Sequence, residues 1–137
     1  MTKILLVDDD EAVRRMFSES LQKVDGFSVD TADDGNQALL KIAQTKPDII
    51  ILDIAMPELS GIQVLEVVKS DSKFKKIPIV MLTATSDYAE INECLAKGAA
   101  SYITKGDRHS EIVDKIKMII KLYRKSSKST GSPQFKF

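Results

Sequence analysis

Ile4–Asp10 reads ILLVDDD, an apolar run that is followed at once by three aspartates. The apolar part is short and rich in branched side chains, as a parallel strand buried on both faces should be. Two further runs have the same character, Ile49–Leu52 and Ile77–Leu82. We predict that these three runs form the central strands of one sheet.

Two further segments have a less apolar strand pattern than these three runs. Phe27–Thr31 and Ala100–Thr104 mix apolar and polar residues, and we predict them as the two edge strands. A stretch with helical spacing of apolar residues follows each strand. The predicted stripes are Val13, Phe17, Leu21 and Val24; Ala38, Leu39, Ile42 and Ala43; Ile62, Leu65 and Val68; Tyr88, Ile91 and Leu95; and Ile112, Ile116, Ile119 and Tyr123.

Strand and helix therefore alternate five times, and Gly26 and Gly98 lie where helix C-caps are expected. This alternation predicts an α/β fold, a flavodoxin-like, doubly wound, five-stranded parallel sheet of order 2-1-3-4-5 with five helices. That order places the topological switch point between the first and third strands.

Composition narrows the class of protein. The 137 residues, 43% apolar and 29% charged, suit one compact domain, and 20 basic residues balance 20 acidic ones. The net charge is therefore zero and gives no reason to expect a nucleic-acid or membrane partner. Cys94 is the sole cysteine, which excludes an internal disulfide and is typical of helix packing. No apolar stretch is long enough to span a bilayer, and we expect no membrane insertion and a cytoplasmic location.

The end of the sequence differs from the rest. From Arg124 onward the residues are mainly Lys, Ser, Thr, Gly and Pro, without apolar periodicity. We predict one domain over residues 1–124 and a flexible tail or truncated linker over residues 125–137.

Carboxylates follow two of the central strands. In open α/β sheets, ligands bind beyond the carboxyl ends of the strands near the switch point. Asp8 and Asp9 follow the first strand and Asp53 ends the third. Two like charges about 4 Å apart cost about 4 kcal/mol at an effective dielectric near 20, so this cluster needs a cation. Oxygen ligands suit Mg²⁺. Asp10 is instead predicted to cap the first helix.

Two further polar residues end strands on the same rim. Thr83 ends the fourth strand, and Lys105 follows the fifth. Alone, each has an ordinary interpretation, a helix-capping hydroxyl and a solvated lysine. Their shared position favours contact with a phosphate.

Four segments together resemble bacterial response-regulator receiver domains, over roughly Lys3–Tyr123. They are Ile4–Asp10 (ILLVDDD), Asp53–Gly61 (DIAMPELSG), Thr83-Ala84 and Tyr102–Lys105 (YITK). Each piece is common, but their joint placement at the strand ends is specific.

The resemblance implies a role for each site residue. Asp53 would be the phosphoacceptor, Asp9 a direct Mg²⁺ ligand, Asp8 a ligand acting largely through water, and the Ala55 carbonyl a further ligand. Lys105 would pair with the phosphate.

The resemblance also implies a switch and partners. The Thr83 hydroxyl would move to the phosphoryl oxygens and Tyr102 would turn inward behind it, changing the face of helix four, strand five and helix five. For Tyr102, ordinary edge-strand packing is an equal alternative. The implied donor is a sensor histidine kinase or a histidine phosphotransfer protein, and the implied target is a downstream protein or a C-terminal output domain outside this sequence. No enzyme activity beyond its own phosphorylation and dephosphorylation is implied.

Four residues call for separate expectations. Gly106 follows Lys105 where the family usually has a proline in a cis peptide, so we expect a more mobile loop and a less firmly held lysine. Ala55 and Thr85 occupy positions where polar residues in the family can orient the hydrolytic water. Since alanine cannot do so, we predict slow self-dephosphorylation. His109 is expected to be a solvated residue at the start of helix five.

Two other classes fit less well. An aspartate-nucleophile phosphatase would have Asp-x-Asp on one strand, whereas Ile54 and Ala55 follow Asp53. A nucleotide or flavin binder on the same fold would carry G-x-G-x-x-G or a P-loop after the first strand, and neither motif is present there.

Overall fold

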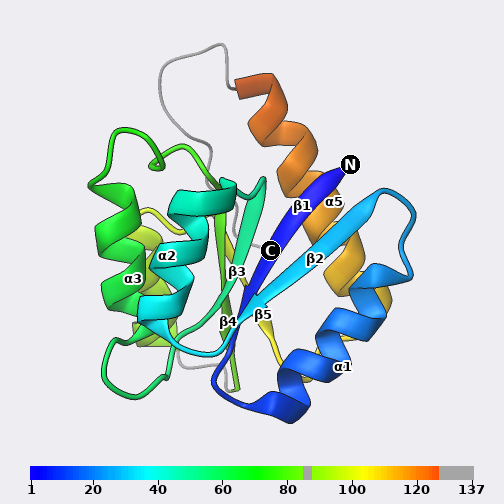
Figure 1. Cartoon of the computed structure of the whole chain (residues 1–137), viewed down its shortest axis with the longest axis horizontal. Helices are drawn as coiled ribbons and strands as arrows, with labels where there is room; N and C mark the ends of the chain where they lie inside the picture. The colour runs from blue at the N-terminus through cyan, green and yellow to red at the C-terminus, as the bar shows by residue number, and fades with distance from the viewer. Residues whose placement is uncertain (85–87, 127–137) are drawn as a thin grey trace.

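A five-stranded parallel sheet forms the centre of the molecule (Figure 1). The computed structural model describes residues 1–84 and 88–126. The strands are β1 (Thr2–Val7), β2 (Phe27–Ala32), β3 (Ile49–Asp53), β4 (Ile79–Thr83) and β5 (Ser101–Thr104). Their order is β2-β1-β3-β4-β5, with neighbours parallel throughout. The predicted fold class, strand order and edge strands are confirmed.

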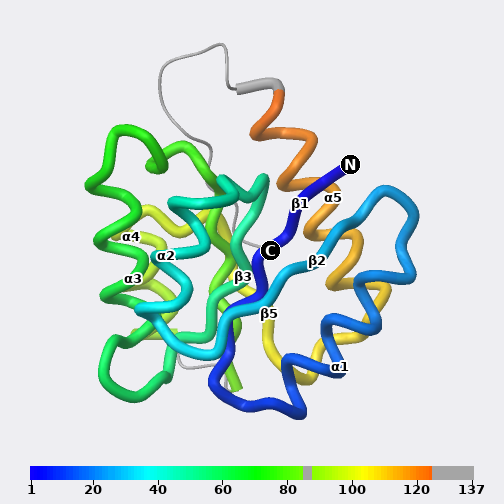
Figure 2. The backbone as a smooth tube through the Cα atoms, in the orientation of Figure 1, coloured from blue at the N-terminus to red at the C-terminus, as the bar shows by residue number. Residues whose placement is uncertain are grey.

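Helices cover both faces of the sheet. They are α1 (Glu11–Gln22), α2 (Gly35–Thr45), α3 (Gly61–Lys69), α4 (Tyr88–Ala96) and α5 (His109–Ser126). Side chains of α1 and α5 form one apolar layer with the sheet, and those of α2, α3 and α4 form the other. Figure 2 shows this division, with α2, α3 and α4 on one side and α1 and α5 on the other.

The central strands are buried because both of their faces are covered. Along β1, Ile4 and Leu6 pack toward α1 and α5, while Leu5 and Val7 pack toward the opposite layer. Every residue of β3 and β4 is buried. Continuous apolar runs are therefore what these positions require, since alternation would place polar groups in one of the two cores.

Some predicted boundaries and helix stripes were wrong. Pro78 lacks a backbone N–H, and β4 begins after it at Ile79, so Ile77 lies in the preceding turn. Val24 lies beyond the end of α1, although it still packs against the core. Ala43 is exposed on α2, and Tyr88 is 66% exposed at the start of α4. Each lies at the edge of its stripe, where helical spacing alone does not fix burial.

The predicted helix caps are found at Asp10 and Gly98 but not at Gly26. Its side chain accepts from the backbone N–H groups of Ala12 and Val13, as an N-cap does. Gly98 has φ of 107°, directly after the last turn of α4. Gly26, with φ of 89°, lies in the turn that leads into β2 rather than at the end of α1.

Three remaining expectations concern composition and the end of the chain. Cys94 is a buried residue of α4 that packs in the core, in agreement with the predicted helix packing. Among the described helices, none combines the length and apolar character needed to cross a membrane. The last helix runs to Ser126, and residues 127–137 of the predicted tail lie outside the described residues.

Candidate functional site

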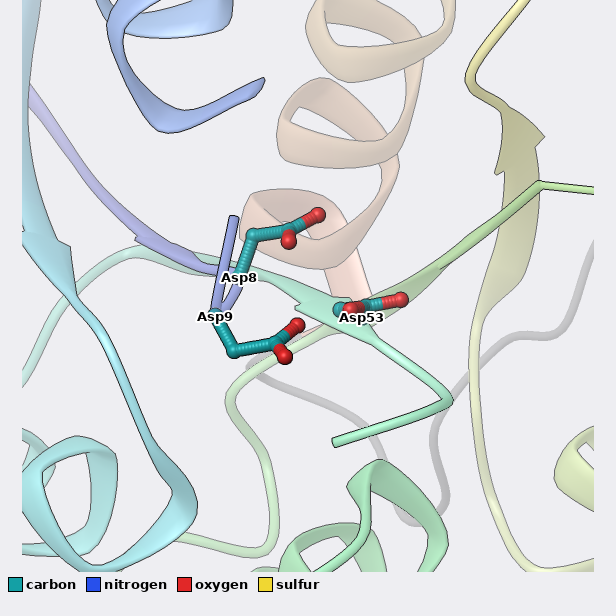
Figure 3. A group of neighbouring side chains, drawn as sticks. All are labelled: Asp8, Asp9 and Asp53. Atoms are coloured by element: carbon teal, nitrogen blue, oxygen red, sulfur yellow. The ribbon is translucent and has the colours of Figure 1, made fainter. Parts of the chain in front are cut away.

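Three carboxylates meet at the carboxyl edge of the sheet. Each of Asp8, Asp9 and Asp53 contributes an oxygen, and these oxygens lie within 4.8 Å of one another. Figure 3 shows Asp8 and Asp9 leaving the end of one strand and Asp53 standing at the end of its neighbour. Asp8 and Asp53 are 0% and 3% exposed, whereas Asp9 is exposed. The predicted juxtaposition is present in the fold.

The pairing of β1 with β3 brings these residues together. Val7 pairs with Leu52 in the parallel register, so the residues that follow each of them reach the same edge of the sheet. The backbone then fixes Asp8, whose N–H donates to the Ala32 carbonyl at 3.2 Å. One Asp8 carboxylate oxygen, Oδ1, accepts from the Asp10 N–H at 2.9 Å.

Arg14 adds a support that the sequence did not indicate. Its guanidinium donates to the Asp8 carbonyl at 2.7 Å from the second turn of α1. Arg14 lies four positions after the cap Asp10, but an arginine at that spacing is ordinary on a helix surface. Only the bend of the chain between β1 and α1 reveals its role.

Lys105 supplies a cation to the cluster. Its ammonium nitrogen lies 3.0 Å from Asp8 Oδ2 and 3.5 Å from Asp53 Oδ1, and its side chain is 24% exposed. Asp8 Oδ2 itself is buried and accepts no aligned hydrogen bond from the described residues. The ion pair with Lys105 therefore leaves this oxygen able to accept a further ligand.

The electrostatic balance of the site is incomplete. Burial, followed by the charge of Asp8, raises the pKa of Asp53 to about 7, and Lys105 only partly opposes the shift. Burial lowers the pKa of Lys105, but its contacts with Asp8 and Asp53 outweigh that effect and the pKa is raised. Three carboxylates beside one ammonium form a group that a further cation would stabilise.

The loop after β3 is held close to Asp53. The Gly61 N–H donates to the Ile54 carbonyl at 2.9 Å, and a Cβ at Gly61 would lie 2.0 Å from the Asp53 carbonyl oxygen. Glu58 adopts a positive φ of 64° in the same loop. The chain thus turns back over Asp53 before α3 begins, and Ala55 is exposed within this loop.

Thr83 and Tyr102 occupy the positions expected from their strands. Thr83 is the buried last residue of β4, and its carbonyl accepts from the Lys105 N–H at 2.8 Å. Tyr102 is half-buried on β5 and packs against the layer that includes α4. From α5, the Lys115 ammonium donates to the Tyr102 carbonyl at 2.9 Å and lies 5.0 Å from the centre of its ring.

The turn that carries Lys105 is closed by a residue missing from the sequence-based prediction. Asp107 accepts from both the N–H and the hydroxyl of Thr104, and its own N–H donates to the Thr104 carbonyl. The Thr-x-x-Asp pattern is a turn signal that could have identified it. His109 is exposed at the start of α5, as predicted, and its ring is hydrogen-bonded to the Ser20 hydroxyl.

The ligand atoms at this edge fit a hard divalent cation. All side-chain donors are carboxylate oxygens, and one of them, Asp8 Oδ2, is buried without an aligned hydrogen bond among the described residues. Mg²⁺ is commonly bound through one or two carboxylates with water completing its coordination. The exposed Asp9 leaves the cluster open to solvent on one side.

The chain is similar in sequence and in structure to proteins of one family. A family model for the response regulator receiver domain matches residues 4–117. Protein PilG of Pseudomonas aeruginosa is 38% identical over 115 residues, 84% of this chain and 84% of that protein. The structure of chemotaxis protein CheY4 of Vibrio cholerae matches with a TM-score of 0.80 at 34% identity, over 86% of this chain and 98% of that one.

Longer relatives match only in part. The DNA-binding response regulator MtrA of Mycobacterium tuberculosis is 36% identical over 115 residues, which make up 84% of this chain but 49% of MtrA. The chain spans about half the length of several such curated relatives.

Proposed function

This chain belongs to the response regulator receiver domain family of two-component signalling, and from that membership we propose that Asp53 accepts a phosphoryl group in a phosphorelay. The observation that carries the proposal is the cluster of Asp8, Asp9 and Asp53 at the carboxyl edge, with the Lys105 ammonium 3.5 Å from Asp53 Oδ1. We assign the function to residues 1–124.

The chemistry requires an ionised Asp53. A carboxylate oxygen attacks phosphorus, the bond from phosphorus to the donor's imidazole nitrogen breaks, and the product is an acyl phosphate. Lys105 lies close enough to offset charge on the transferred group, and positioning with electrostatics supplies most of the catalysis in such transfers. The donor would be the phosphohistidine of a sensor kinase or of a phosphotransfer protein.

Asp9, Asp8, Asp53 and the Ala55 carbonyl would hold Mg²⁺. When bound, the ion supplies positive charge to the phosphoryl oxygens and balances the carboxylate cluster. The residues of the chain account for the rest. Asp53 provides the nucleophile, while the hydrogen bonds from Asp10 and Arg14 hold Asp8 in place.

The proposed switch connects the site to β5. Phosphorylation adds about −1.5 to −2 charge near pH 7, which gives the Thr83 hydroxyl new acceptors. Thr83 would move toward the phosphoryl group and Tyr102 would turn inward behind it. Since Lys115 contacts both the carbonyl and the ring of Tyr102, this movement would reach α5 directly. The face of α4, β5 and α5 would then engage a downstream protein or an output domain.

Incubation with acetyl phosphate and Mg²⁺, followed by intact mass spectrometry, tests the proposal. We expect the native chain to gain one phosphoryl group and Asp53→Asn to gain none. Asp48→Asn is a matched control, because Asp48 precedes the other end of β3 and bonds to the Lys3 N–H. Equal labelling of Asp53→Asn and the native chain would refute the assignment.

A further inference from the structure

The turn between β5 and α5 has a distinctive set of contacts. Thr104 and Asp107 enclose Lys105 and Gly106, and both Asp107 carboxylate oxygens are used by Thr104, one by its N–H at 3.1 Å and one by its hydroxyl. The Asp107 N–H returns to the Thr104 carbonyl at 3.0 Å. These reciprocal bonds close the Thr104–Asp107 turn on itself.

Gly106 contributes little to holding this turn. A Cβ built on it would meet nothing within 4 Å, so the position lies in open space. Glycine also allows its own backbone more conformations than any other residue. The restraint on the turn therefore comes from Asp107 rather than from the residue next to Lys105.

The backbone of Lys105 is held by hydrogen bonds both before and after its Cα. Its N–H donates to the Thr83 carbonyl at 2.8 Å, which continues the pairing of β4 with β5. Beyond it, the Thr104–Asp107 turn sets the direction in which the chain leaves the strand. The ammonium then reaches Asp8 Oδ2 at 3.0 Å and Asp53 Oδ1 at 3.5 Å.

We propose that Asp107 is a positioning residue that directs Lys105 at the phosphoryl group by closing the Thr104–Asp107 turn. This inference rests on the proposed function of Asp53. Asp107 is not one of the three clustered carboxylates, so it acts through the backbone of Lys105 and not on the metal or the acceptor. A displacement of about 1 Å in a reacting group can cost up to roughly a hundredfold in rate, so a loosened turn should be measurable.

The rate of labelling by acetyl phosphate at saturating Mg²⁺ tests this role. We expect Asp107→Ala to slow labelling about tenfold, while Mg²⁺ binding, measured by calorimetry, is not weakened. Asp71→Ala is the matched control, since the Asp71 carboxylate accepts from the Lys73 N–H in a surface turn outside the cluster. It should label at the native rate.

A double-variant comparison separates positioning from general damage to the fold. In a Lys105→Met background, Asp107→Ala should slow labelling by less than about twofold, because its effect passes through Lys105. Equal slowing in both backgrounds, or a native rate in Asp107→Ala alone, would overturn the inference.

The hydroxyl of Thr104 gives a second and milder test. Thr104→Val removes one of the two hydrogen bonds to the Asp107 carboxylate and should slow labelling, whereas Thr104→Ser keeps the hydroxyl and should restore the rate. If Asp107→Ala does not fold, this pair decides, and native rates in both would overturn the inference. A native chain that takes no label at all would instead refute the proposed function of Asp53.

Discussion

Gly61 lies so close to the Asp53 carbonyl that even a methyl side chain would overlap it, at 2.0 Å. The atom that it would meet is backbone, so relief requires a shift of β3 or of α3. We expect Gly61→Ala to lower the free energy of unfolding by about 1–3 kcal/mol and to slow labelling of Asp53. Urea unfolding and the acetyl phosphate assay measure the two effects.

Gly106→Ala is the matched control for Gly61. Its new Cβ would meet no atom within 4 Å, and its φ lies outside the left-handed region. We expect native or slightly higher stability, by up to about 1 kcal/mol, because alanine restricts the unfolded chain. If Gly61→Ala were as stable as Gly106→Ala, the close packing of α3 against the end of β3 would be contradicted.

Ala55 is an exposed residue two positions after Asp53, and its methyl group cannot orient water. We predict that the acyl phosphate on Asp53 decays slowly and that Ala55→Asn speeds its decay in Mg²⁺ buffer. The loss of label after removal of acetyl phosphate gives both rates. Faster decay in the native chain than in Ala55→Asn would contradict the prediction. The other position expected to influence the water, Thr85, lies outside the described residues.

At the scale of single elements, the two aspartates just before α1 have different structural roles. The Asp10 side chain caps α1, whereas Asp9 belongs to the carboxylate cluster. We expect Asp10→Ala to lower the free energy of unfolding by about 1 kcal/mol through loss of the cap, with Mg²⁺ affinity unchanged. Asp9→Ala should show the opposite pattern, weaker Mg²⁺ binding with stability retained. Urea unfolding and calorimetry of both variants measure the two effects. Weaker Mg²⁺ binding in Asp10→Ala, or native Mg²⁺ binding in Asp9→Ala, would contradict the prediction.

We expect Lys69, at the end of α3, to make the stability of the fold depend on pH. Its ammonium donates to the carbonyls of Lys75 and Ile77, at 2.9 and 2.8 Å, and its side chain passes beneath Gly98. Burial lowers its pKa from 10.5 to about 8. Between these values the unfolded chain binds more protons, so the free energy of unfolding should rise with pH from about 8 to about 10.5.

The matched variant for this prediction is Lys69→Met, which keeps the apolar part of the side chain. Relative to that variant, the native protein should gain stability as pH rises through the window, and should show no relative change below it. Urea unfolding of both proteins at several pH values gives the comparison. A relative stability that stays flat or falls between pH 8 and 10.5 would contradict the lowered pKa.

For the whole molecule, the architecture was predictable because it depends on short-range patterns. Runs such as Ile49–Leu52 are buried on both faces, and the mixed segment Phe27–Thr31 lies at an edge. Those patterns specify strand order, and strand order brings Asp8 to Asp53. The contact of Arg14 with the Asp8 carbonyl depends instead on how the chain bends between β1 and α1, which residue spacing does not determine.

Residue spacing also fails to predict how closely individual residues pack in the folded chain. Tyr88 has the correct helical spacing for the core but is 66% exposed, because it stands at the first turn of α4. Gly61 ends one of the segments that resemble receiver domains, but its contact with the Asp53 carbonyl depends on how closely α3 approaches the end of β3. Distances of this kind follow from packing of the complete chain.

The central claim, that Asp53 and no neighbouring carboxylate carries the phosphoryl group, can be measured at the level of the intact protein. The chain is labelled with acetyl phosphate and Mg²⁺ and then reduced with borohydride, which converts an acyl phosphate to an alcohol. Peptide mass spectrometry then locates the reduced residue. We predict homoserine at position 53 alone. Homoserine at position 8 or 9, with an unreduced Asp53, would contradict the account.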